Sequence, residues 1–75
     1  MKDWEPGAQR LGRRVRELRL ARKLLQQHLA DAAGLHRTYI ADIERGKRNP
    51  SLWTIERLAR GLGCDLQDLF SQPRR

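Results

Sequence analysis

The stretch from Gln26 to Gly46, QQHLADAAGLHRTYIADIERG, constrains the fold of this chain more than any other. In its first half, Leu29, Ala30 and Ala33 recur at the spacing at which residues share one face of an α-helix. Gly34 predicts the end of that helix, because a glycine just after the last turn adopts the left-handed conformation at little steric cost. The first half of the stretch is therefore predicted to be a short helix followed by a tight turn.

The second half of the stretch predicts another short helix, which ends at Gly46. Leu35 lies in the turn, while Ile40 and Ile43, three residues apart, form a narrow buried seam. The opposite side of this helix is expected to carry Arg37, Thr38, Ala41, Asp42 and Arg45. Two helices joined by a glycine-containing turn, the second with a polar outer face, form a helix-turn-helix arrangement. An ordinary helical hairpin has the same periodicity, so spacing alone leaves both structures open.

Three further helices are expected around this stretch, and no strands. One runs from about Arg10 to Arg22, with an apolar stripe of Leu11, Val15, Leu18 and Ala21. The next has Ser51 as its N-cap and a stripe of Leu52, Ile55, Leu58, Ala59 and Leu62. Asp65 is expected to cap a final short helix, in a box-like arrangement with Asp68.

The predicted fold class is therefore all-α, with five helices in one domain over residues 10–71. Residues 1–9 are predicted to form an N-terminal arm, because they lack periodicity and contain the turn signal Pro6-Gly7. Trp4 in this arm is expected to pack back onto the helices. Residues 72–75 are predicted to be a short basic tail.

The charge balance favours a polyanionic partner. The chain has 16 Lys and Arg against 9 Asp and Glu, a formal net charge of +7. Thirteen of the basic residues are arginine, whose planar guanidinium binds phosphates and guanine edges bidentately. Nucleic acid is the first candidate partner and an acidic membrane surface the second.

The chain carries little that would support an enzyme, a metal site or a cofactor site. His28 and His36 are eight residues apart without a third metal ligand nearby, and no nucleophile triad or phosphate-binding loop has the required spacing. Cys64 is the single cysteine, which excludes an internal disulfide, and its expected place is the core. No signal peptide, membrane-spanning run or small-molecule pocket is evident, so a cytoplasmic, nucleoid-associated protein is expected.

With these residues laid out, the chain resembles the lambda-repressor-like DNA-binding domains of the XRE family of regulators, over residues 11–70. Within that family it is also similar to the small controller proteins of restriction-modification systems, on Arg37-Thr38-Tyr39-Ile40 and Arg48-Asn49. The motifs that carry the broader resemblance are Gln26-x-x-Leu29-Ala30, Gly34-Leu35, Ile40-x-x-Ile43-Glu44-x-Gly46, Asn49-Pro50-Ser51, Leu58-Ala59-x-x-Leu62-Gly63 and Leu69.

Two positions depart from the family pattern. Leu25 and His36 stand where the family usually has a residue that caps a helix N-terminus. Loss of such a cap costs about 1 kcal/mol, so these helix starts are expected to be looser or capped by another group.

The resemblance implies a role for each exposed polar residue. Arg37, Thr38, Tyr39 and Asp42 would contact bases, with Arg37 the strongest candidate because arginine matches guanine O6 and N7. Asp42 is open to two roles: it accepts from a cytosine amino group, or it restrains a neighbouring arginine. Tyr39 is also open to two, a phosphate contact through its hydroxyl or a base contact through its ring, and Arg45 belongs either to the base contacts or to the phosphate contacts. The candidates for phosphate contacts are Gln26, Arg45, Lys47, Arg48 and Asn49.

The resemblance also implies an ion pair and a dimer. Arg19 and Glu44 match positions that family members pair to hold the second helix of the motif against the bundle. Family members commonly bind double-stranded DNA as homodimers on a pseudopalindromic operator, and the surface expected for this is Leu66, Leu69 and Phe70. The resulting prediction is a sequence-specific transcriptional regulator whose recognition helix, about residues 36–45, enters the major groove. The alternative is a helix-turn-helix adaptor or antitoxin-type protein that acts mainly through a protein partner.

Overall fold

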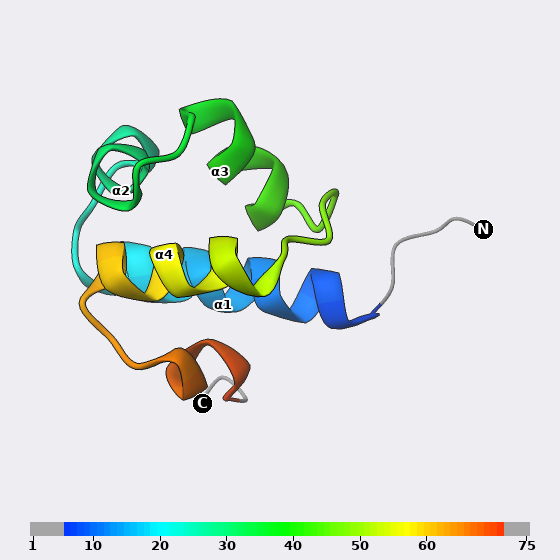
Figure 1. Cartoon of the computed structure of the whole chain (residues 1–75). Helices are drawn as coiled ribbons and strands as arrows, with labels where there is room; N and C mark the ends of the chain where they lie inside the picture. The colour runs from blue at the N-terminus through cyan, green and yellow to red at the C-terminus, as the bar shows by residue number, and fades with distance from the viewer. Residues whose placement is uncertain (1–5, 72–75) are drawn as a thin grey trace.

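The computed structural model describes residues 6–71, which form four α-helices and one short 3₁₀ helix (Figure 1). The elements are α1 (Pro6–Ala21), α2 (Gln26–Ala33), α3 (Arg37–Glu44), α4 (Leu52–Leu62) and the 3₁₀ helix η1 (Leu66–Phe70). This part of the chain contains no strand, so the all-α prediction is confirmed. The count of five α-helices is not, because the last segment is only five residues long and takes the tighter 3₁₀ form that short pieces favour. Trp4 and the tail 72–75 lie outside the described residues.

The first helix begins earlier than expected. Residues 6–9 belong to α1 and not to an arm, because proline is tolerated at the first helical position, where its missing N–H would be unpaired anyway. Ala8 is consequently buried beside Leu11 and Val15. Towards the other end of α1, Ala21 is exposed although it was predicted in the apolar stripe, and the Arg19 side chain is buried instead.

The core lies where the four helices converge. Figure 1 shows α2 and α3 on one side of the α1–α4 pair, with the final segment on the other side. α3 packs against α1 and α2, while α2 packs against α4. The largest fully buried side chains are Leu29, Ile40, Ile43, Leu58, Leu69 and Val15. Leu52, predicted in the α4 stripe, is instead exposed, and Thr54 is buried.

A glycine allows α1 and α3 to come together. A Cβ atom on Gly12 would collide with the carbonyl oxygen of Ile43 and lie 2.9 Å from that of Glu44. The backbone of α1 therefore touches the last turn of α3 directly. The sequence gives no signal for this role of Gly12, because the residue falls within a continuous helical pattern.

The helix ends largely follow the predicted capping chemistry. Gly34 has a φ of 72° and closes α2, where the Arg57 Nε–H also donates to the Ala33 carbonyl at 2.6 Å. The Thr54 N–H donates to the Ser51 hydroxyl at 3.2 Å, which confirms Ser51 as the cap of α4. The Asp65 side chain makes no capping bond, contrary to prediction. Only the reverse half of that box forms: the Asp65 N–H donates to an Asp68 carboxylate oxygen at 3.0 Å.

The start of α2 is capped by an unexpected group. Neither Leu25 nor His36 makes a side-chain cap, as expected from their residue types. The Leu25 N–H instead donates to His28 Nδ1 at 3.0 Å, so the imidazole takes the part that a Glu or Gln side chain has in a capping box, and the hydroxyl acceptor is not replaced. No such hydrogen bond forms at the start of α3 among the described residues.

Candidate nucleic-acid interface

The site is built on α3, which is buried along one side and polar along the other. Ile40 and Ile43 enter the core as predicted. Ala41 was expected on the outer side but is buried, with 8% of its surface exposed, which narrows the polar face. Arg37 and Thr38, in the first turn, are exposed and make no side-chain hydrogen bond to the described residues. These two side chains are therefore available to an external ligand.

A buried ion pair holds α3 in place. Arg19 Nε donates to Glu44 Oε2 at 2.6 Å, and its Nη2 donates to Oε1 at 3.0 Å. The two side chains are only 8% and 4% exposed. A third Arg19 N–H donates to the Leu24 carbonyl at 2.7 Å. The predicted ion pair is confirmed, and its bidentate geometry fixes both the position and the rotation of α3 relative to α1.

Gln26 joins this ion pair. Its Nε2 donates to Glu44 Oε1 at 3.1 Å, so the amide is tied to the end of α3. Gln26 lies at the N-terminus of α2, where free backbone N–H groups attract anions, and its predicted phosphate contact stays a prediction. The carboxylate of Glu44 thus connects three helices at one point.

A second charged group lies on the outer side of α3. Asp42 Oδ1 accepts from Arg45 Nη2 at 2.7 Å, and Asp42 Oδ2 lies 3.5 Å from Arg48 Nε. The Arg48 guanidinium also lies over the Tyr39 ring, 4.9 Å from its centroid. Of the two roles open to Asp42, the structure has the one in which the carboxylate holds neighbouring arginines.

The remaining predicted contacts cluster around the beginning of α3 and the loop after it. Thr38, Tyr39 and Arg48 line a shallow hollow of about 390 Å³ together with Gly34, Leu35 and His36. Lys47 and Asn49 are exposed in the loop that follows. Through Arg48, the structure brings Tyr39, Asp42 and Arg45 together on the outer side of α3. Gln26 lies beside Glu44 at the end of α3, and Asn49 lines a different hollow, with Leu11 and Phe70.

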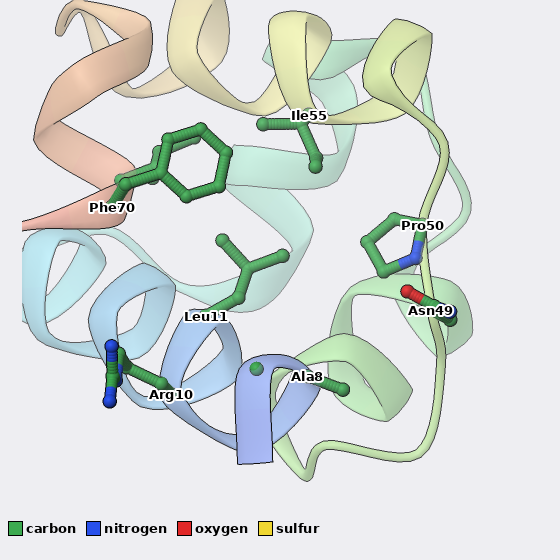
Figure 2. A pocket seen from close by; sticks show the side chains of 9 residues that line it. Ala8, Arg10, Leu11, Asn49, Pro50, Ile55 and Phe70 are labelled. Atoms are coloured by element: carbon green, nitrogen blue, oxygen red, sulfur yellow. The ribbon is translucent and has the colours of Figure 1, made fainter. Parts of the chain in front are cut away.

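The three residues predicted for the dimer surface separate into different environments. Leu69 is 1% exposed and belongs to the core, so its assignment to that surface is wrong. Leu66 is half-buried against the core, whereas Phe70 is 54% exposed. Phe70 borders a hollow of about 310 Å³, into which Leu11 and Ile55 also point (Figure 2). Sequence position alone did not separate Leu69 from Phe70, because both are large apolar neighbours.

Trp53 and Cys64 are two side chains of functional interest outside α3. Trp53, for which no role was predicted, is 59% exposed on α4, and the Arg57 guanidinium lies 4.7 Å from its ring centroid. The exposure of Trp53 could have been predicted from the sequence, because the residue falls outside the apolar stripe of this helix. Cys64 is half-buried and not in the core, and burial, with a smaller contribution from Asp68, raises the pKa of its thiol.

Neither a metal site nor a membrane span is found in the part of the chain that the structure describes. Residues 6–71 contain no group of three His, Cys, Asp or Glu side chains placed to hold a metal ion. No helix among them is both long enough and apolar enough to cross a bilayer.

In this fold the Arg19–Glu44 ion pair holds α3, which exposes Arg37 and Thr38. The arrangement is that of a helix-turn-helix protein, with α2 and α3 as the two helices of the motif. The helix-turn-helix family HTH_3 matches residues 15–69, and the chain belongs to this XRE-like family of DNA-binding regulators. The family resemblance drawn from the sequence is thereby confirmed.

The relatives include restriction-modification controller proteins and a phage repressor. The chain is 49% identical over 60 residues to control protein C.BamHI of Bacillus amyloliquefaciens, which is 79% of this chain and 74% of that protein. It is 44% identical to the immunity repressor of Bacillus phage phi105 over 83% of this chain, a match that spans only 43% of the repressor. The crystal structure of the controller protein C.AhdI from Aeromonas hydrophila superimposes with a TM-score of 0.82 at 44% identity, covering 84% of this chain and 96% of that one.

Proposed function

We propose that this protein is a sequence-specific regulator of transcription that binds double-stranded DNA as a homodimer, with α3 in the major groove. The observation that carries the proposal is α3 itself: its inner end is locked by Arg19 and Glu44, while Arg37 and Thr38 face solvent at its beginning. A reading element must be rigid and must present unpaired donors, because base contacts discriminate only when their geometry is held.

Each exposed residue of α3 has a distinct role in this proposal. Arg37 donates two hydrogen bonds to guanine O6 and N7, and Thr38 contacts the neighbouring base edge or a thymine methyl group. Tyr39, half-buried at its ring, places its hydroxyl towards the backbone of the duplex. The phosphate contacts come from Gln26, Arg45, Lys47, Arg48 and Asn49, which set the register of α3 without reading sequence.

A dimer follows from the size of the reading surface. One α3 of eight residues covers a single half-site, and two half-sites lie about 34–36 Å apart on a pseudopalindromic operator. We place the dimer contact at Phe70 and the part of the adjacent hollow that Leu11 and Ile55 line, away from Asn49 at its other edge, because an exposed aromatic side chain next to an apolar depression suits a self-complementary contact.

The relatives suggest which genes such a regulator controls. C.AhdI is described as a restriction-modification controller protein, and it matches this chain over nearly its whole length. We therefore propose that this chain regulates the genes of a restriction-modification system, its own gene included, while bound to DNA in the nucleoid.

The test is binding to DNA from upstream of its own gene and to a scrambled duplex at one fixed salt concentration. The proposal expects a preference of about 10³-fold or more for the upstream DNA. Arg37→Ala should remove about 1–3 kcal/mol of that preference. The matched control is Arg60→Ala, which removes the same charge from an exposed position on α4 and should leave the preference unchanged.

The result that would overturn the proposal is equal binding of both duplexes by the wild-type protein across operators taken from the surrounding genes. The basic surface would then hold DNA without reading it, and a protein partner would become the better explanation.

A further inference from the structure

The outer side of α3 carries a carboxylate among the groups that are proposed to hold DNA. Asp42 lies on the same face as Arg45, three residues away, and close to Arg48 in the following loop. A negative charge at this place repels phosphates, so its presence on a DNA-binding surface calls for an explanation. The inference below rests on the proposed function, since it concerns how the same surface binds DNA.

The two oxygens of Asp42 are engaged by different arginines. Oδ1 accepts a hydrogen bond from Arg45 at 2.7 Å, while Oδ2 is 3.5 Å from Arg48 Nε. The carboxylate is the more buried partner: its side chain is 21% exposed, against 59% for Arg45 and 52% for Arg48. Asp42 is thus the least mobile side chain of the three, and the two exposed guanidinium groups fold back onto its carboxylate.

Arg48 is restrained a second time. Its guanidinium stacks over the Tyr39 ring, 4.9 Å from the centroid, as cations do over aromatic faces. A phosphate must therefore compete with the carboxylate for the charge of Arg48, and it must approach the edge of a guanidinium that the Tyr39 ring already orients. The same competition applies to Arg45, whose Nη2 donates to Asp42. We call this group of Asp42, Arg45 and Arg48 the Asp42 clamp.

We propose that the Asp42 clamp determines specificity by weakening the phosphate grip of α3 on every duplex. Phosphate contacts raise the affinity of a protein for any duplex, because each neutralised phosphate releases condensed counterions irrespective of base sequence. An arginine that is already paired with a carboxylate gains less from a phosphate. The sequence-independent part of binding is therefore held low, and the contacts of Arg37 and Thr38 to bases make up a larger share of the total.

In this proposal Asp42 acts on arginines and not on a cytosine. Both of its oxygens face arginines, so reading a cytosine amino group would require the carboxylate to turn towards the base or to share an oxygen with it. Asp42 is accordingly a positioning residue, which acts through Arg45 and Arg48 and not by contacting a base.

The decisive comparison is Asp42→Asn against Asp31→Asn. Both variants remove one negative charge, but Asp31 lies on α2 and its side chain accepts only from Gln27 among the described residues. Asp42→Asn is also expected to fold, because a negative charge in the last turn of a helix opposes the helix dipole and its removal relieves that repulsion.

The measurement is affinity for a scrambled duplex over a series of salt concentrations. Asp42→Asn should bind it about 3- to 10-fold more tightly at about 0.1 M salt, and the slope of log affinity against log salt should steepen by about 0.9 for each released arginine. Asp31→Asn should change the affinity less than about twofold and leave the slope unchanged. The ratio of upstream to scrambled affinity should fall in Asp42→Asn alone.

A double-mutant cycle tests the restraint itself. Arg48→Ala should cost about 2- to 5-fold more scrambled-duplex affinity in the Asp42→Asn background than in the wild type. Equal costs in both backgrounds, or equal effects of Asp42→Asn and Asp31→Asn, would overturn the clamp. So would an Asp42→Asn variant that loses upstream affinity while its scrambled affinity is unchanged, since Asp42 would then read a base. The scrambled-duplex arms need no operator, so failure of the proposed function leaves this test readable.

Discussion

Among single residues, Glu44 contributes most to the placement of α3, through its carboxylate. It accepts two hydrogen bonds from Arg19 and one from Gln26, at 2.6, 3.0 and 3.1 Å. A buried charge is costly to remove from water, and only complete pairing of this kind offsets that cost. Because every buried side-chain N and O atom among the described residues has a partner, loss of one member leaves the others exposed to the full penalty.

Glu44→Ala is predicted to lower the free energy of unfolding by about 3–5 kcal/mol, because the Arg19 guanidinium would remain buried without its counter-ion. Such a loss is a large part of the roughly 5–15 kcal/mol that stabilises a domain, so the variant should melt early or be unfolded. Chemical denaturation followed by circular dichroism measures it. The matched control is Glu17→Ala: Glu17 pairs with Arg14 at 2.6 Å, but it is 43% exposed. That variant should lose less than about 1 kcal/mol. Similar losses in the two variants would contradict the importance of burial.

Single residues show where prediction from sequence ends. The pairing of Arg19 with Glu44 followed from the family resemblance, and the structure has it. The partners of Asp42 could not be chosen from spacing, because a base, Arg45 and Arg48 were all within reach of the same carboxylate. Leu69 and Phe70 were likewise indistinguishable, since the 3₁₀ geometry of η1 decides which of two adjacent apolar side chains enters the core.

At the scale of elements, the crossing of α1 and α3 determines how far the reading helix projects. The two helices approach so closely at Gly12 that no side chain fits between their backbones. A larger residue would push the last turn of α3 outward and strain the Arg19–Glu44 pair, which spans the same two helices. The close approach and the ion pair thus position α3 together.

Gly12→Ala is predicted to destabilise the domain by about 1–3 kcal/mol, although alanine is the better helix former, because overpacking outweighs the gain in helix propensity. It should also reduce DNA preference, since α3 must shift. The control is Gly7→Ala in the same helix, where a new Cβ would meet nothing within 4 Å. That variant should be unchanged or up to about 1 kcal/mol more stable. Thermal melting and duplex binding of the two proteins decide the matter, and a neutral Gly12→Ala would contradict the crossing.

Helix boundaries were predictable wherever a local chemical rule applied. Gly34 and Ser51 mark helix ends through backbone conformation and a hydroxyl acceptor, and both act as expected. The start of α1 was missed because Pro6-Gly7 also signals a turn, and the burial of Ala8 against the rest of the core is a tertiary effect. The hydrogen bond from the Leu25 N–H to His28 was missed for a different reason: it depends on the rotamer of the imidazole, which spacing does not reveal.

At the scale of the whole molecule, the two sides of the α1–α4 pair carry different properties. α2 and α3 lie on one side of this pair and η1 lies on the other (Figure 1). The first side presents Arg48 of the proposed DNA surface, stacked on Tyr39, and the segment on the other side carries exposed Phe70. A dimer contact on the η1 side would leave both copies of α3 free to bind DNA. Charge indicated the first surface from the sequence, whereas the second required the structure to separate Phe70 from Leu69.

Phe70→Ala is therefore predicted to weaken self-association about 10- to 200-fold, because burial of the exposed half of this side chain is worth about 0.8–1.6 kcal/mol and a two-fold interface contains the residue twice. Sedimentation velocity over a concentration series, without DNA, measures the effect. The control is Leu25→Ala, which removes a similarly exposed apolar side chain from the start of α2 and should leave association unchanged.

Thermal melting separates association from folding: Phe70→Ala should retain its monomer stability, whereas Leu69→Ala should lose about 2–5 kcal/mol from the core. Unchanged association in Phe70→Ala would move the dimer contact to another surface, with exposed Leu52 and Trp53 of α4 the next to be substituted.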